Sequence, residues 1–285
     1  MAAYADYKLL RVELRQSGVC VVTIESDHQS GTNLLTMGLF DELDRLTKQV
    51  EKDDAVRVLV MRSANPVFWI PHFDVESIIT IKVDKPAKKF DQVRGIQAVS
   101  QRLRTMGKPT IAEVAGKLGG GGCELASGFD MRFGVLGRTV VSNQEVGIGC
   151  LAGGGGTVRW PQLVGRGRAL EVLLGGVELD ASVAERWGWL NRAFPTVESC
   201  TAYVDWLAER LAGLPSEALR KTKQSVDYSL ARPGQMEDAL SEEQYLFQQL
   251  LRLPEAQALM RRFMERGGQT MAVESRPDAL LASKL

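Results

Sequence analysis

Four consecutive glycines at residues 119–122 constrain this chain more than any other stretch. They follow a short apolar run at 111–115 and precede small residues that begin a helix carrying one carboxylate, Glu124. A strand-to-helix turn built from glycine lets a ligand approach the backbone closely, because no Cβ blocks it. The first N–H groups of the helix then point at that ligand. The run predicts a site for a negatively charged oxygen beside a carboxylate, with a flexible glycine loop as the alternative.

The composition narrows the class of protein. The chain has 285 residues, 45% of them hydrophobic, which suits one large domain or two smaller ones. Lys plus Arg and Asp plus Glu both number 35, and this balance disfavours a nucleic-acid binder. The four cysteines form no C-x-x-C pair, as is typical of a reduced cytoplasmic protein. Two histidines make a His-rich metal site unexpected, and neither a signal peptide nor a membrane span is expected.

Strands and helices alternate over the first two thirds of the sequence. Residues 7–14 and 19–24 predict a hairpin, and Thr36 is expected to cap a helix that ends near residue 52. Further β-rich segments alternate with segments of helical periodicity, and Val93 is expected on the inward face of a helix over 91–106. The expected later strands are 56–61, 111–115, 131–135, 139–141 and 190–194. This alternation predicts an α/β fold.

The character of the sequence changes near residue 196. Helical periodicity continues to about residue 266, and no strand pattern follows. We therefore expect a core over 1–195, a helical C-terminal region over 196–266, and a loosely ordered polar tail over 267–285. Apolar positions of the helical region predict either subunit contacts or packing within the chain.

An unusually apolar loop at 65–74 directly follows a predicted strand. Ligands of open α/β sheets bind where strands end, so the loop is expected to line a pocket, with packing beneath a lid as the alternative.

The carboxylates Glu124 and Glu145 both lie in glycine-rich turns. Two such groups can share one water, with one deprotonating it while the other supplies or retains the second proton. The alternative is that each is a turn or capping carboxylate. Residues 147–152 match the dinucleotide fingerprint literally, but the polar residues before them do not predict the required strand. P-loop and G-x-S-x-G motifs are absent.

Taken together, the motifs resemble the crotonase superfamily, that is, the enoyl-CoA hydratase/isomerase family. The resemblance covers roughly residues 10–265, and its motifs agree in order and spacing. The segments that carry it are 56–60, 108–112, 120–126, 144–149, 155–159 and 163–166.

The resemblance implies a crotonase-like spiral of ββα repeats and a helical C-terminal oligomerisation region that forms a homotrimer or a dimer of trimers. It also implies acyl-CoA thioester substrates, with coenzyme A as part of the substrate and no separate cofactor. The reaction it favours is hydration of a 2-enoyl-CoA to a 3-hydroxyacyl-CoA. The alternatives are isomerisation, hydrolysis of the thioester or of a carbon–carbon bond, decarboxylation, or a non-catalytic scaffold or RNA-associating role.

Site residues follow from the same resemblance. Glu124 and Glu145 correspond to the two glutamates that hydratases of the family use around the catalytic water. The backbone N–H groups of His72 and Gly121 correspond to the oxyanion hole, which binds the thioester oxygen. The expected substrate-binding positions, several of which act through their backbone, are Asn33, Leu34, Phe68, Trp69, Ile70, Gly120 and Gly153.

The sequence departs from the family pattern around this site. Pro71 and His72 replace small residues in the first oxyanion segment, and Gln144 stands where proline usually precedes the second glutamate. Trp69 is expected to place bulk beside the acyl channel. These changes predict a specialised acyl substrate, carried by coenzyme A or by a carrier protein.

Overall fold

The computed structural model describes residues 4, 6–25, 31–81, 84, 86 and 91–266. The polar tail expected at 267–285 lies outside these residues. The chain forms two compact units, Met1–Ala212 and Gly213–Leu285, which are described separately.

The larger sheet of the first unit has six strands in the order β1-β2-β3-β5-β7-β10. β1 and β2 form the antiparallel hairpin expected from the sequence, and every other neighbouring pair is parallel. All six residues of β2 are buried, as expected for an apolar strand covered on both faces. The strands span Leu10–Leu14, Val19–Ile24, Val58–Ser63, Thr110–Val114, Met131–Val135 and Arg192–Phe194.

A smaller sheet lies beside it, with the order β4-β6-β8-β9. Its strands are Phe68–Ile70, Lys117–Gly119, Val140–Ser142 and Leu179–Asp180. β4, β6 and β8 run parallel, whereas β9 is antiparallel to β8. In three successive repeats, β3/β4, β5/β6 and β7/β8, the first strand enters the large sheet and the second enters the small sheet. The carboxyl ends of β4, β6 and β8 therefore share one edge of the small sheet.

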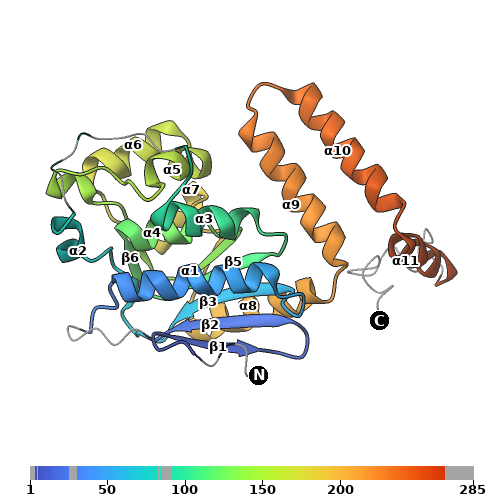
Figure 1. Cartoon of the computed structure of the whole chain (residues 1–285), viewed down its shortest axis with the longest axis horizontal. Helices are drawn as coiled ribbons and strands as arrows, with labels where there is room; N and C mark the ends of the chain where they lie inside the picture. Colours follow the sequence, from blue (N-terminus) through green and yellow to red (C-terminus); the bar gives the residue numbers. More distant parts are fainter. Residues whose placement is uncertain are drawn as a thin grey trace. The chain divides into compact units, whose positions relative to one another are not determined.

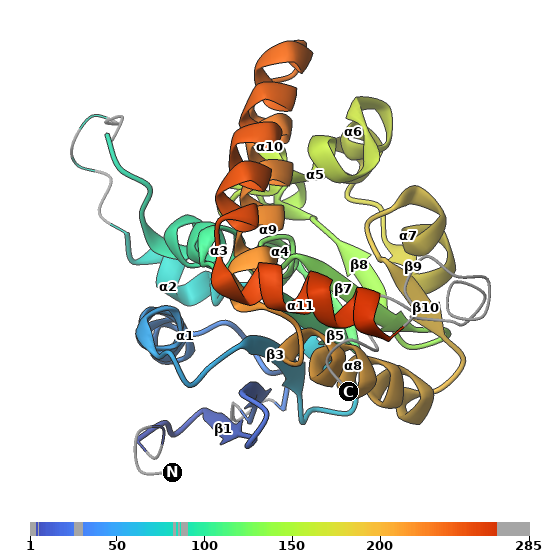
Figure 2. The same cartoon turned by 90° about the vertical axis from the view of Figure 1, so that its right-hand side faces the viewer.

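Helices cover both faces of the large sheet. Thr36 caps α1 (Met37–Lys52) by accepting the N–H of Leu39, as the sequence predicts. Figure 2 shows α3 (Gly95–Thr105) and α4 (Gly120–Ala126) on one side of the strands and α8 (Val197–Ala212) on the other. The remaining helices of this unit are α2 (Val75–Ile79), η2 (Glu145–Ile148), α5 (Gly156–Val164), α6 (Arg166–Gly175) and α7 (Ala181–Trp187).

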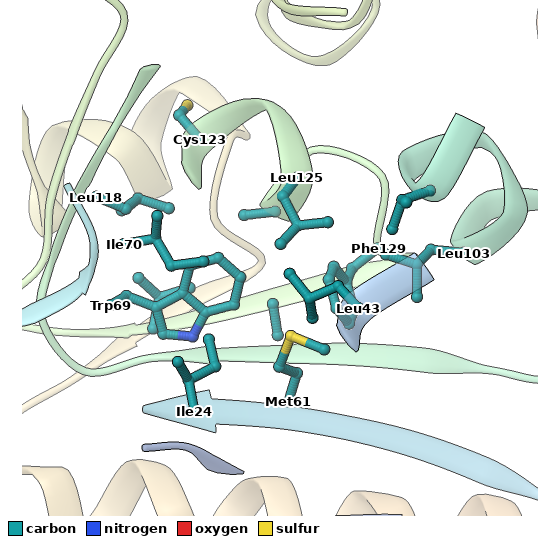
Figure 3. Close-up of a cluster of buried hydrophobic side chains, with 14 of the residues drawn as sticks. Ile24, Leu43, Met61, Trp69, Ile70, Leu103, Leu118, Cys123, Leu125 and Phe129 are labelled. Carbon is teal, nitrogen blue, oxygen red and sulfur yellow. The ribbon is translucent and has the colours of Figure 1, made fainter. Parts of the chain in front are cut away.

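The main core lies between the large sheet, the small sheet and the helices α1, α3 and α4. Figure 3 shows part of it, where Met61 of β3, Leu118 of β6 and Leu125 of α4 gather around Trp69. The expectation that Val93 faces inward is wrong: α3 begins at Gly95, and the Val93 side chain is 56% exposed.

The helix α8 belongs to the first unit. Its buried residues Cys200, Val204 and Ala208 pack in one cluster with Val21 and Val60 of the large sheet. The first compact unit consequently ends at Ala212 rather than at residue 195, because α8 supplies the cover for one sheet face.

The second unit is helical. It contains α9 (Ser216–Ala231), α10 (Met236–Leu251) and α11 (Pro254–Glu265), and α9 and α10 lie side by side (Figure 1). Tyr245 and Phe247 of α10 are exposed, at 58% and 56%. No helix in the described ranges is both long enough and apolar enough to cross a membrane.

Candidate active site

The glycine run forms the end of β6 and the first turn of α4, and every residue of α4 is buried. The run packs directly on the chain that leaves β4. A Cβ built on Gly119 would lie 2.7 Å from the carbonyl oxygen of Pro71, and one on Gly122 would overlap the carbonyl oxygen of Ile70. The glycines are therefore required by a close backbone approach, which excludes the flexible-loop alternative.

Glu124 projects from this buried helix, and its residue surface is only 4% exposed. Its Oε1 accepts the backbone N–H of Gly156 at 2.9 Å, and the N–H of Gly154 also donates to the carboxylate. Burial is the main cause that raises the pKa of Glu124 to about 7, and the charge of Glu145 adds to it. A carboxyl group with this pKa can take up or release a proton near neutral pH.

Glu145 begins the short helix η2 and is only partly buried. Its Oε1 accepts the side-chain Nδ2–H of Asn143 at 3.0 Å. Asn143 is 1% exposed, and its Oδ1 accepts the Nε1–H of Trp160 at 2.6 Å. Neither Asn143 nor Trp160 is among the site residues expected from the sequence. The available signal was a polar residue at a strand end, where α/β sheets place ligands.

Gly120 lies between Glu145 and His72. A Cβ built on Gly120 would lie 3.3 Å from Glu145 Oε1 and 3.3 Å from His72 Cβ, and its φ of +45° favours glycine. Gly121 occupies the first turn of α4, where backbone N–H groups have no acceptor within the helix. The structure thus brings Glu145, His72, Gly120 and Gly121 together, while the joint use of the His72 and Gly121 amides stays a prediction.

The segment at Asn33 and Leu34 reaches the same region. The next residue, Leu35, donates its N–H to the carbonyl oxygen of His72 at 3.0 Å. Asn33 has a left-handed backbone (φ 58°), and its buried amide donates to the carbonyl oxygen of Trp69 at 2.5 Å. This loop is therefore fixed against the β4 segment. Its contact with substrate stays a prediction.

Two of the three expected pocket residues of β4 have side chains that lie in the core. Trp69 and Ile70 are fully buried in the main core, where the Trp69 ring meets Phe129 edge-on at 6.4 Å (Figure 3). The Trp69 side chain consequently does not stand beside a channel. Phe68 is partly buried. Any contribution of Trp69 and Ile70 to binding would come from the backbone, as the resemblance implies for this segment.

Gly153 is exposed, and its carbonyl oxygen accepts the Nε2–H of Gln97 at 2.7 Å. It directly precedes Gly154, which donates to Glu124. The expected substrate-binding role of Gly153 is therefore compatible with its place beside one carboxylate, and it stays a prediction.

The assembled geometry can perform acid–base chemistry next to an anion-binding turn. Two carboxylates approach from different elements, and a helix start provides N–H groups with the positive end of its dipole. The Glu124 carboxyl group, with a pKa of about 7, can exchange a proton near neutral pH. No group of three or more side chains suited to holding a metal ion occurs among the residues that the structure describes.

The chain is similar to known proteins over most of its length. The family model for enoyl-CoA hydratase/isomerase matches residues 14–271. The chain is 32% identical over 189 residues to the fatty acid oxidation complex subunit alpha of Idiomarina loihiensis, a match that covers 66% of this chain and 26% of that protein. The chain thus spans about a quarter of the length of this relative. It is 28% identical to the mitochondrial enoyl-CoA hydratase of Pongo abelii, with 84% and 81% of the two chains covered.

Solved structures agree in fold. The enoyl-CoA hydratase from Bacillus anthracis superposes with a TM-score of 0.80 at 21% identity, covering 91% of this chain and 97% of the other. A candidate enoyl-CoA hydratase from Streptomyces avermitilis superposes with a TM-score of 0.68 at 31% identity, covering 98% of both chains.

Proposed function

The chain belongs to the enoyl-CoA hydratase/isomerase family, within the crotonase superfamily, and we propose that it hydrates a 2-enoyl-CoA to a 3-hydroxyacyl-CoA. The observation that carries the proposal is the pairing of Glu124 and Glu145 across the glycine turn, with one of them titrating near neutrality. A double-bond shift needs one working acid–base group, whereas addition of water needs both a proton acceptor and a proton donor. The presence of two placed carboxylates therefore favours hydration.

The proposed chemistry follows from the positions of the groups. The thioester oxygen binds the backbone N–H groups of His72 and Gly121, which stabilise the enolate that forms there. As the water oxygen bonds to C3, one carboxylate accepts a proton from the water. The carboxyl pair delivers one proton to C2 as the enolate collapses, so it gives up as many protons as it takes up and water is added in full. The proposed reaction uses no cofactor other than the coenzyme A of the substrate.

The closing experiment is a product analysis. Purified protein would be incubated with a panel of 2-enoyl-CoA thioesters in ¹⁸O-labelled water, and the products identified by mass spectrometry. Hydration adds one labelled water to the acyl chain and leaves the thioester intact. Isomerisation leaves the mass unchanged, and thioester hydrolysis releases free coenzyme A, so either result as the main outcome would overturn the proposal. Both carbon chain length and polar substituents should vary in the panel, because Pro71 and His72 replace the small residues of the family.

Assembly and location extend the proposal. A homotrimer or a dimer of trimers is supported by exposed apolar side chains in the helical unit, such as Tyr245 and Phe247. Light scattering after size-exclusion chromatography tests this, and a monomer at micromolar concentration would refute it. A cytoplasmic location is supported by free cysteines at all four positions.

A further inference from the structure

Asn143 is a buried amide that connects one catalytic carboxylate to the core. It directly follows β8, which ends at Ser142, and it is 1% exposed. A buried amide must find partners for both its oxygen and its nitrogen. Here Oδ1 accepts the Trp160 Nε1–H at 2.6 Å, while Nδ2 lies 3.0 Å from Glu145 Oε1 and 3.4 Å from the carbonyl oxygen of Gly120. Both ends of the amide are therefore occupied.

Trp160 determines which way this amide faces. The indole Nε1–H can only donate, so it requires the amide oxygen on its side and leaves the amide nitrogen facing Glu145. A flipped amide would set Oδ1 against a carboxylate oxygen and turn the NH₂ group toward an N–H. Each of these contacts is repulsive. The side chain of Asn143 therefore has one favourable orientation.

The indole that imposes this choice is itself held rigidly. Trp160 of α5 is fully buried, and its ring stacks on that of Trp189, with centroids 5.8 Å apart and planes inclined by 29°. A donor buried in this way moves little, so it offers a fixed reference point for Asn143.

Glu145 depends on this fixed hydrogen-bond donor because the short helix that carries it has no buried residue. It begins a short 3-10 helix whose neighbouring residues Val146 and Ile148 are 40% and 58% exposed. Within the described part of the chain, Asn143 is the side chain that donates a hydrogen bond to the Glu145 carboxylate. Without it, the carboxylate would be free to rotate toward solvent.

We propose that Trp160 and Asn143 form a positioning pair that fixes the Glu145 carboxylate for catalysis, with Trp160 acting on Glu145 through Asn143. The proposal rests on the hydratase function proposed above for this site. It assigns Trp160 a part in turnover although its indole lies behind the residue that touches Glu145. Positioning errors of about an ångström in an acid–base group commonly cost orders of magnitude in rate.

A double-mutant cycle tests the proposal. Values of kcat and KM, with an enoyl-CoA that the wild type hydrates as the substrate, would be measured for wild type, Trp160→Phe, Asn143→Leu and the double variant. Loss of the indole N–H should lower kcat roughly 10-fold and loss of the amide roughly 100-fold, with KM changed less than about 2-fold. Because Trp160 acts through Asn143, the double variant should be no slower than Asn143→Leu. The pairing would be overturned if kcat of the double variant fell by the product of the two single-variant losses, or if Trp160→Phe kept full kcat.

Trp189 provides a matched control. It is equally buried and stacks on Trp160, but its indole nitrogen has no hydrogen-bond partner among the described residues. Trp189→Phe therefore removes the same group from the same aromatic stack and should keep kcat within about 2-fold. A loss as large as that of Trp160→Phe would show a general packing effect and contradict the proposal.

A second measurement does not depend on turnover. In protein with ¹⁵N-labelled tryptophan and ¹³C-labelled glutamate, Asn143→Leu should move the Trp160 indole resonance and speed its hydrogen exchange. Trp160→Phe should move the Glu145 carboxyl resonance although no atom touching Glu145 has changed. An unmoved Glu145 resonance would refute the positioning pair even in a folded protein that hydrates none of the substrates tested. Absence of hydration with both resonances moved would refute the proposed function alone.

Discussion

Glu124 and Glu145 face one site from supports of opposite character. Glu124 stands on α4, whose residues are all buried, and backbone N–H groups of Gly154 and Gly156 donate to it. Glu145 stands on η2, which has no buried residue, and a side-chain amide holds it. The backbone N–H groups that hold Glu124 cannot be removed by replacing a side chain. The amide that holds Glu145 can be lost through one substitution, that of Asn143. Burial therefore sets the proton affinity of Glu124, while a hydrogen-bonded side chain sets the direction of the Glu145 carboxylate.

The largest expected effect comes from removing either carboxylate. Glu124→Gln and Glu145→Gln should each lower kcat for hydration by about 10²–10⁴, because each removes an acid–base group. Steady-state rates with a substrate established by product analysis would measure this. If the two carboxylates act as a unit, the double variant should be little slower than the worse single variant. Full activity in either single variant would show that the pair has been misassigned.

A glycine substitution compares the rigidity of the two supports. Gly122→Ala places a methyl group onto the carbonyl oxygen of Ile70, a backbone atom that cannot turn aside. It should cost about 3 kcal/mol of unfolding free energy or prevent folding. Gly147→Ala in η2 meets no atom within 4 Å and should stay within about 0.5 kcal/mol of wild type. Urea denaturation measures the unfolding free energy of both variants. Equal losses would show that the segments carrying Glu124 and Glu145 do not differ in rigidity.

The raised pKa of Glu124 predicts a pH-dependent cost to stability. Its folded pKa of about 7 exceeds the ordinary value of 4.5, so the folded state holds this proton more tightly than the unfolded chain. Below the ordinary pKa both states are protonated and the cost is absent. It grows as the pH rises from 4.5 and is complete above 7.

Glu124→Gln removes this titration and should be more stable than wild type by about 2–3 kcal/mol near pH 8, with little difference near pH 4. Urea denaturation of both proteins at the two pH values would measure the gain. A difference that does not change with pH would show that the carboxyl group is not perturbed by burial.

The smallest effect compares two thiols. Cys150, which follows η2, is exposed, whereas Cys123 beside Glu124 is fully buried and burial raises its pKa well above the ordinary value. A thiol reagent should modify Cys150 within minutes and leave Cys123 unmodified in the native protein. Intact-mass and peptide mass spectrometry would count and locate the adducts. Modification of Cys123 at a comparable rate would mean that α4 opens readily.

The large sheet was predictable from the sequence, whereas in the small sheet only β8 was expected, at 139–141. Strands such as β2 and β3 carry runs of apolar, β-branched residues, which a buried parallel sheet requires. β4 and β6 have three residues each and β9 has two, so they are too short to show a period. Their strand conformation comes from pairing with neighbours far away in the sequence. The loop expected at 65–74 therefore contained a strand.

The site, like the fold, was predictable only in part. The glycine turn and both glutamates could be identified, because close backbone approach and paired carboxylates leave marks on the residue types. The bond between Asn143 and Trp160 could not, since the two residues are 17 positions apart and belong to a strand end and a helix. Whether Trp69 faces a channel or the core also depended on β4, which the sequence pattern did not reveal.

The small sheet also makes the site modular. Each of its three parallel strands ends at the same edge of the sheet and leads into a different wall of the site. β4 leads into Pro71 and His72, β6 leads into the glycine turn, and β8 leads into Asn143 and Glu145. The strands fix where each wall begins, and the segment beyond each strand fixes what that wall presents. A family built on this plan can exchange one wall at a time. Grafting a relative's segment in place of residues 71–74 should therefore retune substrate choice while both glutamates keep their supports.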